Sequence, residues 1–357
     1  MTPAELDSGW FARTVPRKPQ SLLWEITNGC NLRCRHCESA AGVKLPQELS
    51  RDEAMDVCDQ IVAMKWRRVS ITGGEPLLRP DWAEIARRLS HGGCSVALIT
   101  NGLRFDQQAA DRAKEAGVAT VALSLDGLAE THNRIRPAAG AEQRSGFAAA
   151  ITQINLWNYD QLPALHQLLT ELGVDGWQLQ NAVPLGRLRE IDEPYVLPVT
   201  RLVELEAYCA RLIQERAAGG RGPTIAVMHS IGYYGKNETV IRAGYRQTRR
   251  RFFVGCVGGW RGLAITADGL IKPCAILPRL FAVGDLRRER LAEIWADEDR
   301  FAYQSHWDEA KLEGYCARCE YRCICRAGCT AMAYALTGSI YHNPYCIYGH
   351  AMRESGA

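Results

Sequence analysis

Apolar residues between positions 21 and 181 fall into short runs that alternate with longer amphipathic stretches. Each run ends at a turn or a polar residue, which is typical of strands buried in a parallel sheet. The amphipathic stretch after the first run begins with a capping box, Ser50 with Glu53 three residues on, and predicts a helix. Six strands are expected, at 22–27, 68–72, 95–100, 120–125, 152–156 and 177–181.

This alternation predicts an α/β fold in which parallel strands are joined by right-handed helical crossovers. Six units favour a partial (β/α)6 TIM-type barrel over a complete eight-stranded barrel. The Gly-Gly-Arg-Gly-Pro segment at 219–223 breaks the pattern and marks the expected end of the barrel. The expected organisation is an N-terminal extension (1–20), the barrel (21–218), a linker (219–255), a small, irregular, cysteine-rich C-terminal domain (256–350) and a tail (351–357).

The composition is that of a globular protein, with 47% hydrophobic and 23% charged residues. A net charge of +3 is too small to indicate nucleic acid as the main partner. No apolar run is long enough for a spanning helix, and the N-terminal residues lack the pattern of a signal peptide. We therefore expect a cytoplasmic protein with neither nucleic acid nor membrane as its partner.

Fourteen cysteines are unusual for such a chain. In a reducing cytosol thiols persist as thiols, and clustered cysteines there usually bind metal. Three of them lie within residues 30–37 and eight within residues 256–346. The remaining three stand alone on apolar segments and are interpreted as small core residues: Cys58, Cys94 and Cys209.

The first cysteine cluster, Cys30-Asn-Leu-Arg-Cys34-Arg-His-Cys37, places three thiols on a loop directly after the first expected strand. Three thiolates can hold three corners of a [4Fe–4S] cube and leave the fourth iron open to another ligand. A zinc site with His36 as the fourth ligand is the alternative. The spacing favours the iron–sulfur cluster.

The second expected strand ends in Thr72-Gly73-Gly74-Glu75-Pro76. Two glycines allow a ligand to approach the backbone closely and leave amides and carbonyls free, while Glu75 adds a carboxylate. This combination suits a zwitterionic amino acid, and an ordinary strand-to-loop turn is the alternative. Ligands of parallel α/β sheets bind at the carboxyl ends of strands, where both motifs are expected to lie.

CNLRCRHC followed by GGEP resembles the radical S-adenosylmethionine (SAM) superfamily. The resemblance continues with Thr100-Asn101-Gly102, with Ser124-Leu125-Asp126-Gly127, and with His132 and Arg136 as an H-x3-R segment. It implies that the SAM-cleaving cluster is ligated by three residues: Cys30, Cys34 and Cys37.

The same resemblance implies a set of SAM contacts. The amino group is expected at Gly73, Gly74 and Glu75, the ribose or carboxylate at Ser124 and Arg136 with Asn101 and Asp126 nearby, and the adenine along Gln178-Leu179-Gln180. A turn-capping role is the alternative for Ser124, Asn101 and Asp126, and a surface position is the alternative for Arg136.

One connection departs from the family pattern, which has a longer helix before the fifth strand. A parallel crossover needs a dozen or more residues, usually with a helix, and residues 127–150 barely supply them. Either this helix is unusually short, or a stretch is missing from the sequence between Phe147 and Ile151. We favour the second explanation.

The C-terminal cysteines follow the order Cys-x12-Gly-x4-Cys, then Cys-x2-Cys-x5-Cys-x3-Cys, then a last cysteine. This order resembles the SPASM domain of radical SAM enzymes that mostly modify peptides, and a zinc ribbon is the alternative. The resemblance implies two auxiliary [4Fe–4S] clusters, one on Cys316, Cys319, Cys325 and Cys346 and the other on Cys256, Cys274 and Cys329. The second cluster either has an open iron or recruits Cys323, which is otherwise a spare thiol.

The resemblance implies a radical SAM oxidoreductase with three [4Fe–4S] clusters, whose 5′-deoxyadenosyl radical abstracts hydrogen from an unactivated carbon. The implied substrate is a side chain of a ribosomally made peptide, which is cross-linked or oxidised. The implied partners are that precursor, a separate leader-binding protein, and a reductase or flavodoxin/ferredoxin. Two other reactions are alternatives: formylglycine formation, and maturation of a quinone or haem cofactor. Ala275 disfavours the first, because formylglycine-forming enzymes have Asp at that position. A non-enzymatic iron–sulfur electron carrier is the third alternative.

Overall fold

The structure is a computed structural model, and it describes residues 10–137, 148–229, 231–243 and 252–354. Within these residues ten strands form one sheet, in the order β10-β9-β8-β1-β2-β3-β4-β5-β6-β7. Neighbouring strands from β8 through β1 to β7 pair in parallel, and β9 and β10 are added antiparallel. The strands are β1 (Ser21–Glu25), β2 (Arg68–Thr72), β3 (Ser95–Thr100), β4 (Thr120–Ser124), β5 (Ala149–Ile154), β6 (Gly176–Asn181), β7 (Thr224–Met228), β8 (Gly262–Ile265), β9 (Leu270–Lys272) and β10 (Gly284–Asp285).

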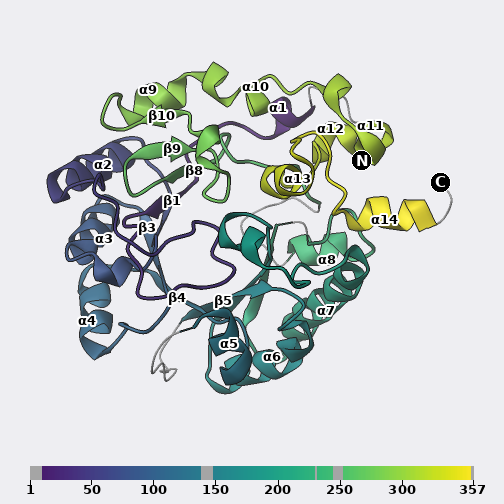
Figure 1. Cartoon of the computed structure of the whole chain (residues 1–357), viewed down its shortest axis with the longest axis horizontal. Helices are drawn as coiled ribbons and strands as arrows, with labels where there is room; N and C mark the ends of the chain where they lie inside the picture. The colour runs from purple at the N-terminus through teal and green to yellow at the C-terminus, as the bar shows by residue number, and fades with distance from the viewer. Residues whose placement is uncertain (1–9, 138–147, 230, 244–251, 355–357) are drawn as a thin grey trace.

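Helices surround this sheet (Figure 1). The α-helices are α1 (Trp10–Thr14), α2 (Arg51–Ala63), α3 (Trp82–His91), α4 (Gln107–Glu115), α5 (Ala129–Ile135), α6 (Leu162–Glu171), α7 (Val199–Ala217), α8 (Glu238–Ala243), α9 (Leu291–Ala296), α10 (Ala302–Ser305), α11 (Gly314–Arg318), α12 (Arg322–Cys325), α13 (Thr330–Thr337) and α14 (Ile347–Glu354). Short 3-10 helices are η2 (Pro76–Leu78), η3 (Tyr159–Gln161), η4 (Gly186–Glu190), η5 (Arg279–Phe281), η6 (Glu298–Phe301) and η7 (Glu309–Lys311).

The predicted α/β partial barrel with a parallel sheet is confirmed, and its first six strands lie where the apolar runs placed them, although β5 begins three residues earlier than residue 152. The expectation that the strand–helix rhythm stops at 219–223 is wrong. Strand β7 follows that segment and pairs in parallel with β6, inside the predicted linker. Gly219, with φ +92°, ends α7 in a left-handed conformation, so the glycines terminate a helix rather than the barrel.

The C-terminal region also contributes to the sheet, which the sequence did not indicate. Strand β8 pairs in parallel with β1, with Leu23 opposite Ala264, and β9 and β10 continue from it. The first part of the predicted irregular domain is therefore continuous with the barrel. Only the segment after β10 is free of strands within the described residues.

The short connection between β4 and β5 is made with α5, a helix of seven residues. Strand β5 starts at Ala149 and pairs in parallel with β4, with Ser124 opposite Ile151. The first of the two explanations, a short helix, therefore describes this crossover, and the missing stretch that we favoured is not needed to close it. Residues 138–147, which include Phe147, lie outside the described residues.

Apolar residues of the strands pack under the helices because side chains alternate between the two faces of a strand. Leu22 and Trp24 of β1 share a buried cluster with Ile61 of α2 and Ile85 of α3. The capping box predicted at the start of α2 is present, with Ser50 and Glu53 bonded to each other's backbone amides. The lone cysteines are buried as expected: Cys58, Cys94 and Cys209.

The opposite face of the sheet carries half-buried polar residues, among them Glu25 of β1, Ser124 of β4 and Gln178 of β6. The loop 26–50 connects β1 to α2 and is drawn in dark purple near the middle of Figure 1. Apart from one bridge between Gly29 and Gly42, it contains no regular secondary structure. It holds the first cysteine cluster.

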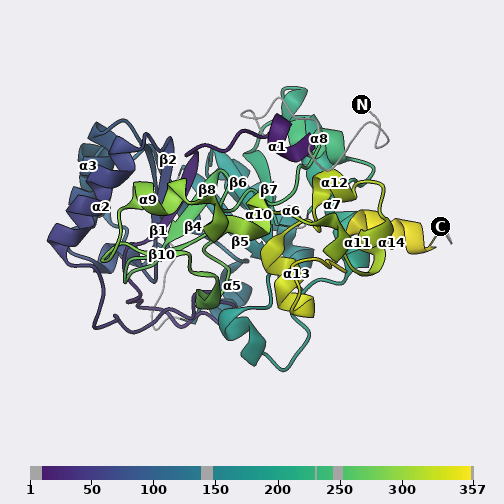
Figure 2. The ribbon, with the colours of Figure 1, turned by 90° about the horizontal axis from the view of Figure 1, so that it is seen from above.

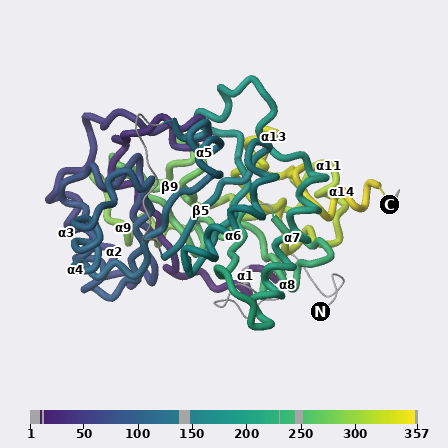
Figure 3. The backbone as a smooth tube through the Cα atoms, turned by 90° about the horizontal axis from the view of Figure 1, so that it is seen from below, coloured from purple at the N-terminus to yellow at the C-terminus, as the bar shows by residue number. Residues whose placement is uncertain are grey.

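Figures 2 and 3 show that α11, α13 and α14 gather at the end of the molecule opposite α2 and α3. Helix α1 lies against α12, where the guanidinium of Arg326 sits 4.4 Å from the ring centroid of Phe11. The N-terminal segment is thereby attached to the cysteine-rich region. In the part of the chain that the structure describes, no helix has the length and apolarity needed to cross a bilayer.

Candidate functional site

The three cysteines of the first cluster lie on the loop 26–50. Cys30 and Cys37 are half-buried and Cys34 is buried. The Cys30 amide donates to the Gly42 carbonyl over 2.8 Å, and the Leu32 amide points at the Cys30 sulfur over 3.4 Å. The loop therefore presents three thiols, two of them partly accessible, on a backbone that is internally bonded.

The Gly73-Gly74-Glu75 segment lies directly against this loop. The Gly74 amide donates to the Thr27 carbonyl over 2.7 Å and the Glu75 amide donates to the Gly29 carbonyl over 2.8 Å. The expectation that these amides are free for a ligand is therefore wrong, because the loop's own backbone takes them. The two glycines are required for this close approach, since a Cβ on either would fall on a carbonyl oxygen, that of Thr27 or of Gly29.

Replacing Gly74 by alanine is expected to destabilise the protein by at least about 2 kcal/mol, because the new methyl group would collide with backbone that has no freedom to move. Gly42→Ala, in the same loop, is the matched control, since a Cβ there meets nothing within 4 Å. We expect that control to change stability by less than about 1 kcal/mol. Denaturant unfolding under anaerobic conditions measures both, and equal effects would contradict the proposed contact.

Glu75 is fully buried and its carboxylate bonds to the end of β3 and to η2. It accepts from the Thr100 hydroxyl over 2.8 Å, from the Asn101 amide over 2.8 Å and from the Leu77 amide over 3.2 Å. Burial raises the pKa of Glu75, and these three donors oppose that rise. Its predicted contact with the SAM amino group stays a prediction; in the structure the carboxylate connects β2 to β3.

Asn101 extends the connection to the cluster loop. Its side-chain amide donates to the Asn31 side-chain oxygen over 2.8 Å and points at the Cys30 sulfur over 4.0 Å. Its own oxygen accepts from the Leu103 amide over 3.0 Å, which is a turn-capping contact. Asn101 therefore does both things that were expected of it: it lies beside the cysteine loop, and it caps a turn.

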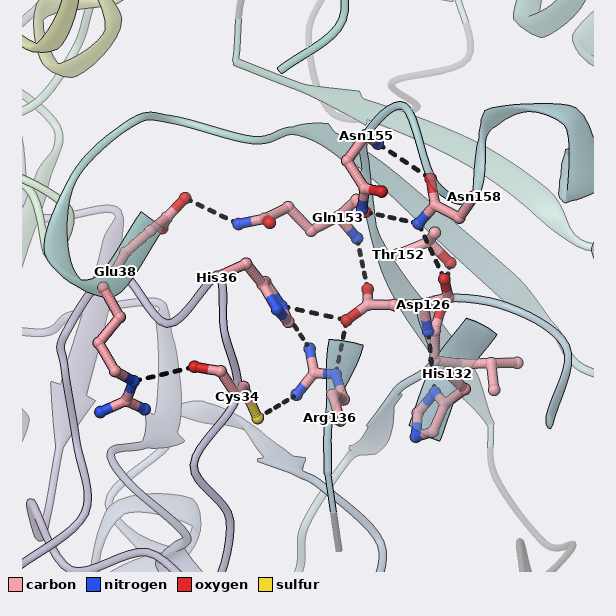
Figure 4. Close-up of polar contacts among 12 residues, drawn as sticks. Cys34, His36, Glu38, Asp126, His132, Arg136, Thr152, Gln153, Asn155 and Asn158 are labelled. Atoms are coloured by element: carbon pink, nitrogen blue, oxygen red, sulfur yellow. Dashed lines mark hydrogen bonds and ion pairs between the residues drawn. The ribbon is translucent and has the colours of Figure 1, made fainter. Parts of the chain in front are cut away.

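Asp126, Arg136 and His36 form a buried network beside Cys34 (Figure 4). The Arg136 Nε lies 2.5 Å from Asp126 Oδ2, and His36 Nε2 lies 3.1 Å from the same oxygen. Arg136 also points one N–H at the Cys34 sulfur over 3.9 Å. The alternative that Arg136 is a surface residue is wrong, because it joins the end of β4 to the cysteine loop.

Charge decides the protonation of this network. Burial favours a neutral Asp126, but Arg136 and His36 hold the pKa of that carboxyl well below its usual range. Burial also raises the pKa of the Cys34 thiol to about 11, and Arg136 opposes this rise. Because cluster ligation needs the thiolate, Arg136 favours the ligating form of Cys34.

The zinc alternative for this loop is disfavoured. His36, its required fourth ligand, bonds through Nε2 to Asp126 and Arg136 and is buried. No three His, Cys, Asp or Glu side chains converge on a single ion anywhere in the described ranges.

The remaining predicted SAM contacts are placed differently from one another. Ser124 ends β4 on the polar face of the sheet, near the network of Asp126. Leu179 is fully buried and belongs to the apolar cluster that contains Leu165 of α6 and Leu202 of α7. Its side chain therefore lies in the core, and the structure does not bring it to the site, whereas Gln178 beside it is half-buried on the other face.

In the C-terminal region the structure groups the cysteines in the predicted way. Four of them border one cavity together with Tyr234 and Tyr348: Cys316, Cys319, Cys325 and Cys346. The other three influence one another electrostatically: burial first, and then the neighbouring thiols Cys256 and Cys274, raise the pKa of Cys329. Two separate thiol groups result, and their roles as ligands stay predictions.

Cys323 belongs to neither group. It is buried, and its sulfur lies 3.5 Å from a carboxylate oxygen of Glu309, beside Arg322. This placement favours the interpretation as a spare thiol over recruitment to the three-cysteine group.

We expect Cys323→Ser to keep the full iron content, because its sulfur faces Glu309 rather than the other cysteines. Cys325→Ser, two residues away, removes a sulfur from the four-cysteine cavity and is expected to lower the iron content by up to about four atoms per chain. Iron analysis of anaerobically purified protein tests the pair. A loss of iron in Cys323→Ser equal to that in Cys325→Ser would contradict this assignment.

Sequence reasoning missed two buried arginines that reach the cysteine loop, Arg79 and Arg187. Neither lies in the motifs from which the site was predicted. The only signals were an arginine shortly after Gly-Gly-Glu-Pro and a Gly-Arg pair after the sixth expected strand, and both patterns are too common to indicate a role by themselves.

Known proteins resemble this chain in sequence and in fold. The sequence matches the Radical SAM superfamily over residues 24–166 and the iron–sulfur cluster-binding SPASM domain over residues 256–320. An AdoMet-dependent heme synthase of Methanosarcina barkeri is 32% identical over 360 residues, which cover 92% of this chain and 97% of the relative. A PqqA peptide cyclase of Granulibacter bethesdensis is 25% identical, with 94% and 90% covered.

Solved structures show the same fold. SuiB of Streptococcus suis bound to S-adenosylmethionine aligns with a TM-score of 0.71 at 17% identity, covering 92% of this chain and 77% of that one. The enzyme anSMEcpe with bound AdoMet aligns with a TM-score of 0.69 at 18% identity, covering 93% and 95%. At these identities the likeness concerns the fold alone.

Proposed function

The chain belongs to the radical SAM superfamily of enzymes and carries a C-terminal SPASM domain, and on this premise we propose that it modifies a haem-type tetrapyrrole by hydrogen abstraction. As a member of this superfamily it binds SAM and a [4Fe–4S] cluster, and its SPASM domain binds auxiliary iron–sulfur clusters. The alternative of a non-enzymatic electron carrier is therefore wrong. The number of three clusters and the individual ligands belong to the proposal.

One observation carries the proposed chemistry: three thiols lie on a loop that is bonded to the ends of β2 and β3 and to the network at the end of β4. A [4Fe–4S] cluster held there by Cys30, Cys34 and Cys37 would supply the electron that splits SAM into methionine and a 5′-deoxyadenosyl radical.

Residues around the three-cysteine loop hold it in position. Arg136 favours the thiolate of Cys34 and is held by the buried carboxylate of Asp126. Glu75 fixes the strand ends on the other side. The half-buried polar face of the sheet offers donors and acceptors for a substrate, among them Ser124 and Gln178.

The proposed substrate class rests on the sequence relatives. The relative at 32% identity is a heme synthase that matches along almost its full length, and a pre-heme d1 synthase of Dinoroseobacter shibae is 26% identical. A ribosomally made peptide is the second candidate, because a PqqA peptide cyclase and the mycofactocin maturase MftC of Mycobacterium tuberculosis are 25% and 26% identical. Formylglycine formation is a weaker alternative, since Ala275 provides no carboxylate after Cys274.

The test is a turnover experiment with dithionite-reduced, anaerobically prepared enzyme and SAM. We expect iron-coproporphyrin III to increase the formation of 5′-deoxyadenosine several-fold and to change in mass, and we expect neither effect with a Cys30→Ala variant. A parallel arm co-expresses the enzyme with any short peptide encoded beside it. Absence of both effects with the tetrapyrrole, together with a mass change in the peptide, would overturn the first candidate in favour of the second.

The electron source and other partners remain predictions. A flavodoxin or ferredoxin with its reductase is expected to supply the electron in place of dithionite. A separate leader-binding protein is expected only for the peptide candidate. Replacing dithionite by a purified flavodoxin system in the same assay tests the first of these.

A further inference from the structure

The cysteine loop has an unusual amount of irregular backbone to satisfy. Residues 26–50 carry one isolated bridge and otherwise no helix or strand, and long loops without secondary structure are uncommon in compact domains unless they serve a function. Buried carbonyl groups need donors, because an unpaired one costs free energy comparable to a lost hydrogen bond. The question is which groups bind the carbonyls of this loop.

Arg79 binds the carbonyls where the loop begins and ends. One guanidinium nitrogen donates to the carbonyls of Ile26 and Leu49, each over 2.9 Å, and the other donates to the Ser50 carbonyl over 3.2 Å. Asp81 holds the same guanidinium through two bonds of 2.8 and 2.9 Å. Arg79, which directly follows η2, thereby holds the two ends of the loop together.

Arg187 binds the carbonyls next to the thiols. Its Nε donates to the Cys34 carbonyl over 2.9 Å, its Nη1 donates to the Ala41 carbonyl over 2.8 Å, and its backbone amide donates to the Cys37 carbonyl over 3.1 Å. Arg187 is only 9% exposed. One residue of η4 therefore contacts the backbone of two of the three cysteines.

Gly186 makes this contact possible. Its φ of +58° lies in the left-handed region, and a Cβ there would fall on the carbonyl oxygens of Cys37 and Glu38. Such an approach of backbone to backbone requires glycine. The backbone of Gly186 and Arg187 therefore packs directly against the backbone of the cysteine loop.

From these contacts we propose that Arg187, seated by Gly186, is the positioning residue that holds the cysteine loop in its ligating geometry before a cluster is bound. A guanidinium presents its donors in a rigid planar fork, so it fixes the Cys34 and Ala41 carbonyls relative to each other. Because Cys34 and Cys37 are held through their own backbone, their side chains start from fixed positions. Arg187 acts through the backbone of the loop, to which all three of these bonds are made.

The position of Arg187 in the chain links the predicted cluster site to the predicted SAM site. It lies in η4, which follows β6, the strand predicted to line the adenine of SAM. The predicted cluster site and the predicted adenine site are therefore joined through a few residues. This inference rests on membership in the superfamily and is independent of whether the substrate is a tetrapyrrole or a peptide.

The experiment compares Arg187→Met and Arg187→Lys with the wild type. Arg300→Met is the matched control, because Arg300 also makes several bonds, to Glu289, Asp297 and the Val283 carbonyl, but lies away from the loop. A triple variant with alanine at Cys30, Cys34 and Cys37 gives the reference for complete loss of the SAM cluster. The readouts are iron per chain and the electron paramagnetic resonance signal of the reduced protein with and without SAM.

We expect Arg187→Met to lose the SAM-responsive signal and to approach the iron content of the triple variant, while it keeps the signals of the auxiliary clusters. Arg187→Lys is expected to be intermediate, since lysine restores the charge but not the fork, and Arg300→Met is expected to match the wild type. Wild-type iron and a full SAM-responsive signal in Arg187→Met would overturn the proposal. Loss of the auxiliary signals as well would also overturn it, because the effect would then be general unfolding rather than local positioning.

Discussion

Replacing Cys34 by alanine is expected to reduce SAM cleavage to the background of protein without a cluster and to lower the iron content by about four atoms per chain. Cys34 is the buried member of the three cysteines, and it receives an N–H of Arg136 at its sulfur and of Arg187 at its carbonyl. With two thiolates left, the cube has lost one of its three protein ligands, and the Nε2 of the nearby His36 is already bonded to Asp126. The measurement is 5′-deoxyadenosine formed by reduced protein, together with iron analysis.

Cys58→Ala is the control for this prediction. Cys58 is fully buried in the apolar cluster of β1–β3 and α2, where its thiol points at the Ile85 carbonyl over 3.9 Å. We expect it to keep its iron and its SAM cleavage, with a modest loss of stability. SAM cleavage by Cys34→Ala at the rate of Cys58→Ala would contradict the assignment of the loop.

Asp126→Asn is expected to destabilise the protein by about 3 kcal/mol, because it leaves the mostly buried guanidinium of Arg136 without its counter-charge. The carboxylate is fully buried and binds three groups: Arg136 over 2.5 Å, His36 over 3.1 Å and the backbone N–H of Gln153 over 2.8 Å. The amide of asparagine keeps the volume but cannot balance the charge. Denaturant unfolding at pH 7 under anaerobic conditions measures the difference.

The pH gives a second readout of the same prediction. The pKa of Asp126 is lower in the folded state than its ordinary value, because Arg136 and His36 outweigh the effect of burial. Its contribution is therefore fully present at pH 7 and is lost only as the pH falls below the ordinary range of an aspartate. The Asn variant is expected to lack this part of the acid sensitivity.

Asp59→Asn provides the matched control, since Asp59 pairs with Arg88 on the surface. Both side chains of that pair are about half exposed, at 49% and 56%. Solvent and salt screen such a pair, so its loss is expected to cost less than about 1 kcal/mol. Equal destabilisation by the two substitutions would show that the buried network contributes no more than a surface ion pair.

The sequence predicted the barrel well where burial sets the pattern. The strands β1, β2, β3 and β6 alternate buried residues with more exposed ones because helices cover one of their faces, and their ends were visible as turns or polar residues. Strand β7 was missed because the preceding Gly-rich turn was interpreted as a boundary. The pairing of β8 with β1 joins residues more than two hundred positions apart, and no local pattern indicates such a contact.

In the site, too, residues that belong to a sequence motif were predicted, and residues placed by distant contacts were not. The cysteines, Glu75, Asp126 and Arg136 were predicted because they lie in motifs with recognisable spacing. Their physical roles differ in part from the expected ones: Gly73 and Gly74 make room for the loop's own backbone rather than for a ligand alone. Arg187 was not predicted, because its contacts with Cys34 and Cys37 depend on how η4 folds back over the loop.

The most direct test of the central claim is electron paramagnetic resonance, with electron–nuclear double resonance, of the reduced enzyme mixed with SAM labelled with 17O and 15N in its methionine part. If the loop of Cys30, Cys34 and Cys37 leaves one iron of a [4Fe–4S] cluster open, the spectrum will show hyperfine coupling of both labels to the cluster. A cluster signal that neither shifts with SAM nor couples to the labels would contradict the account.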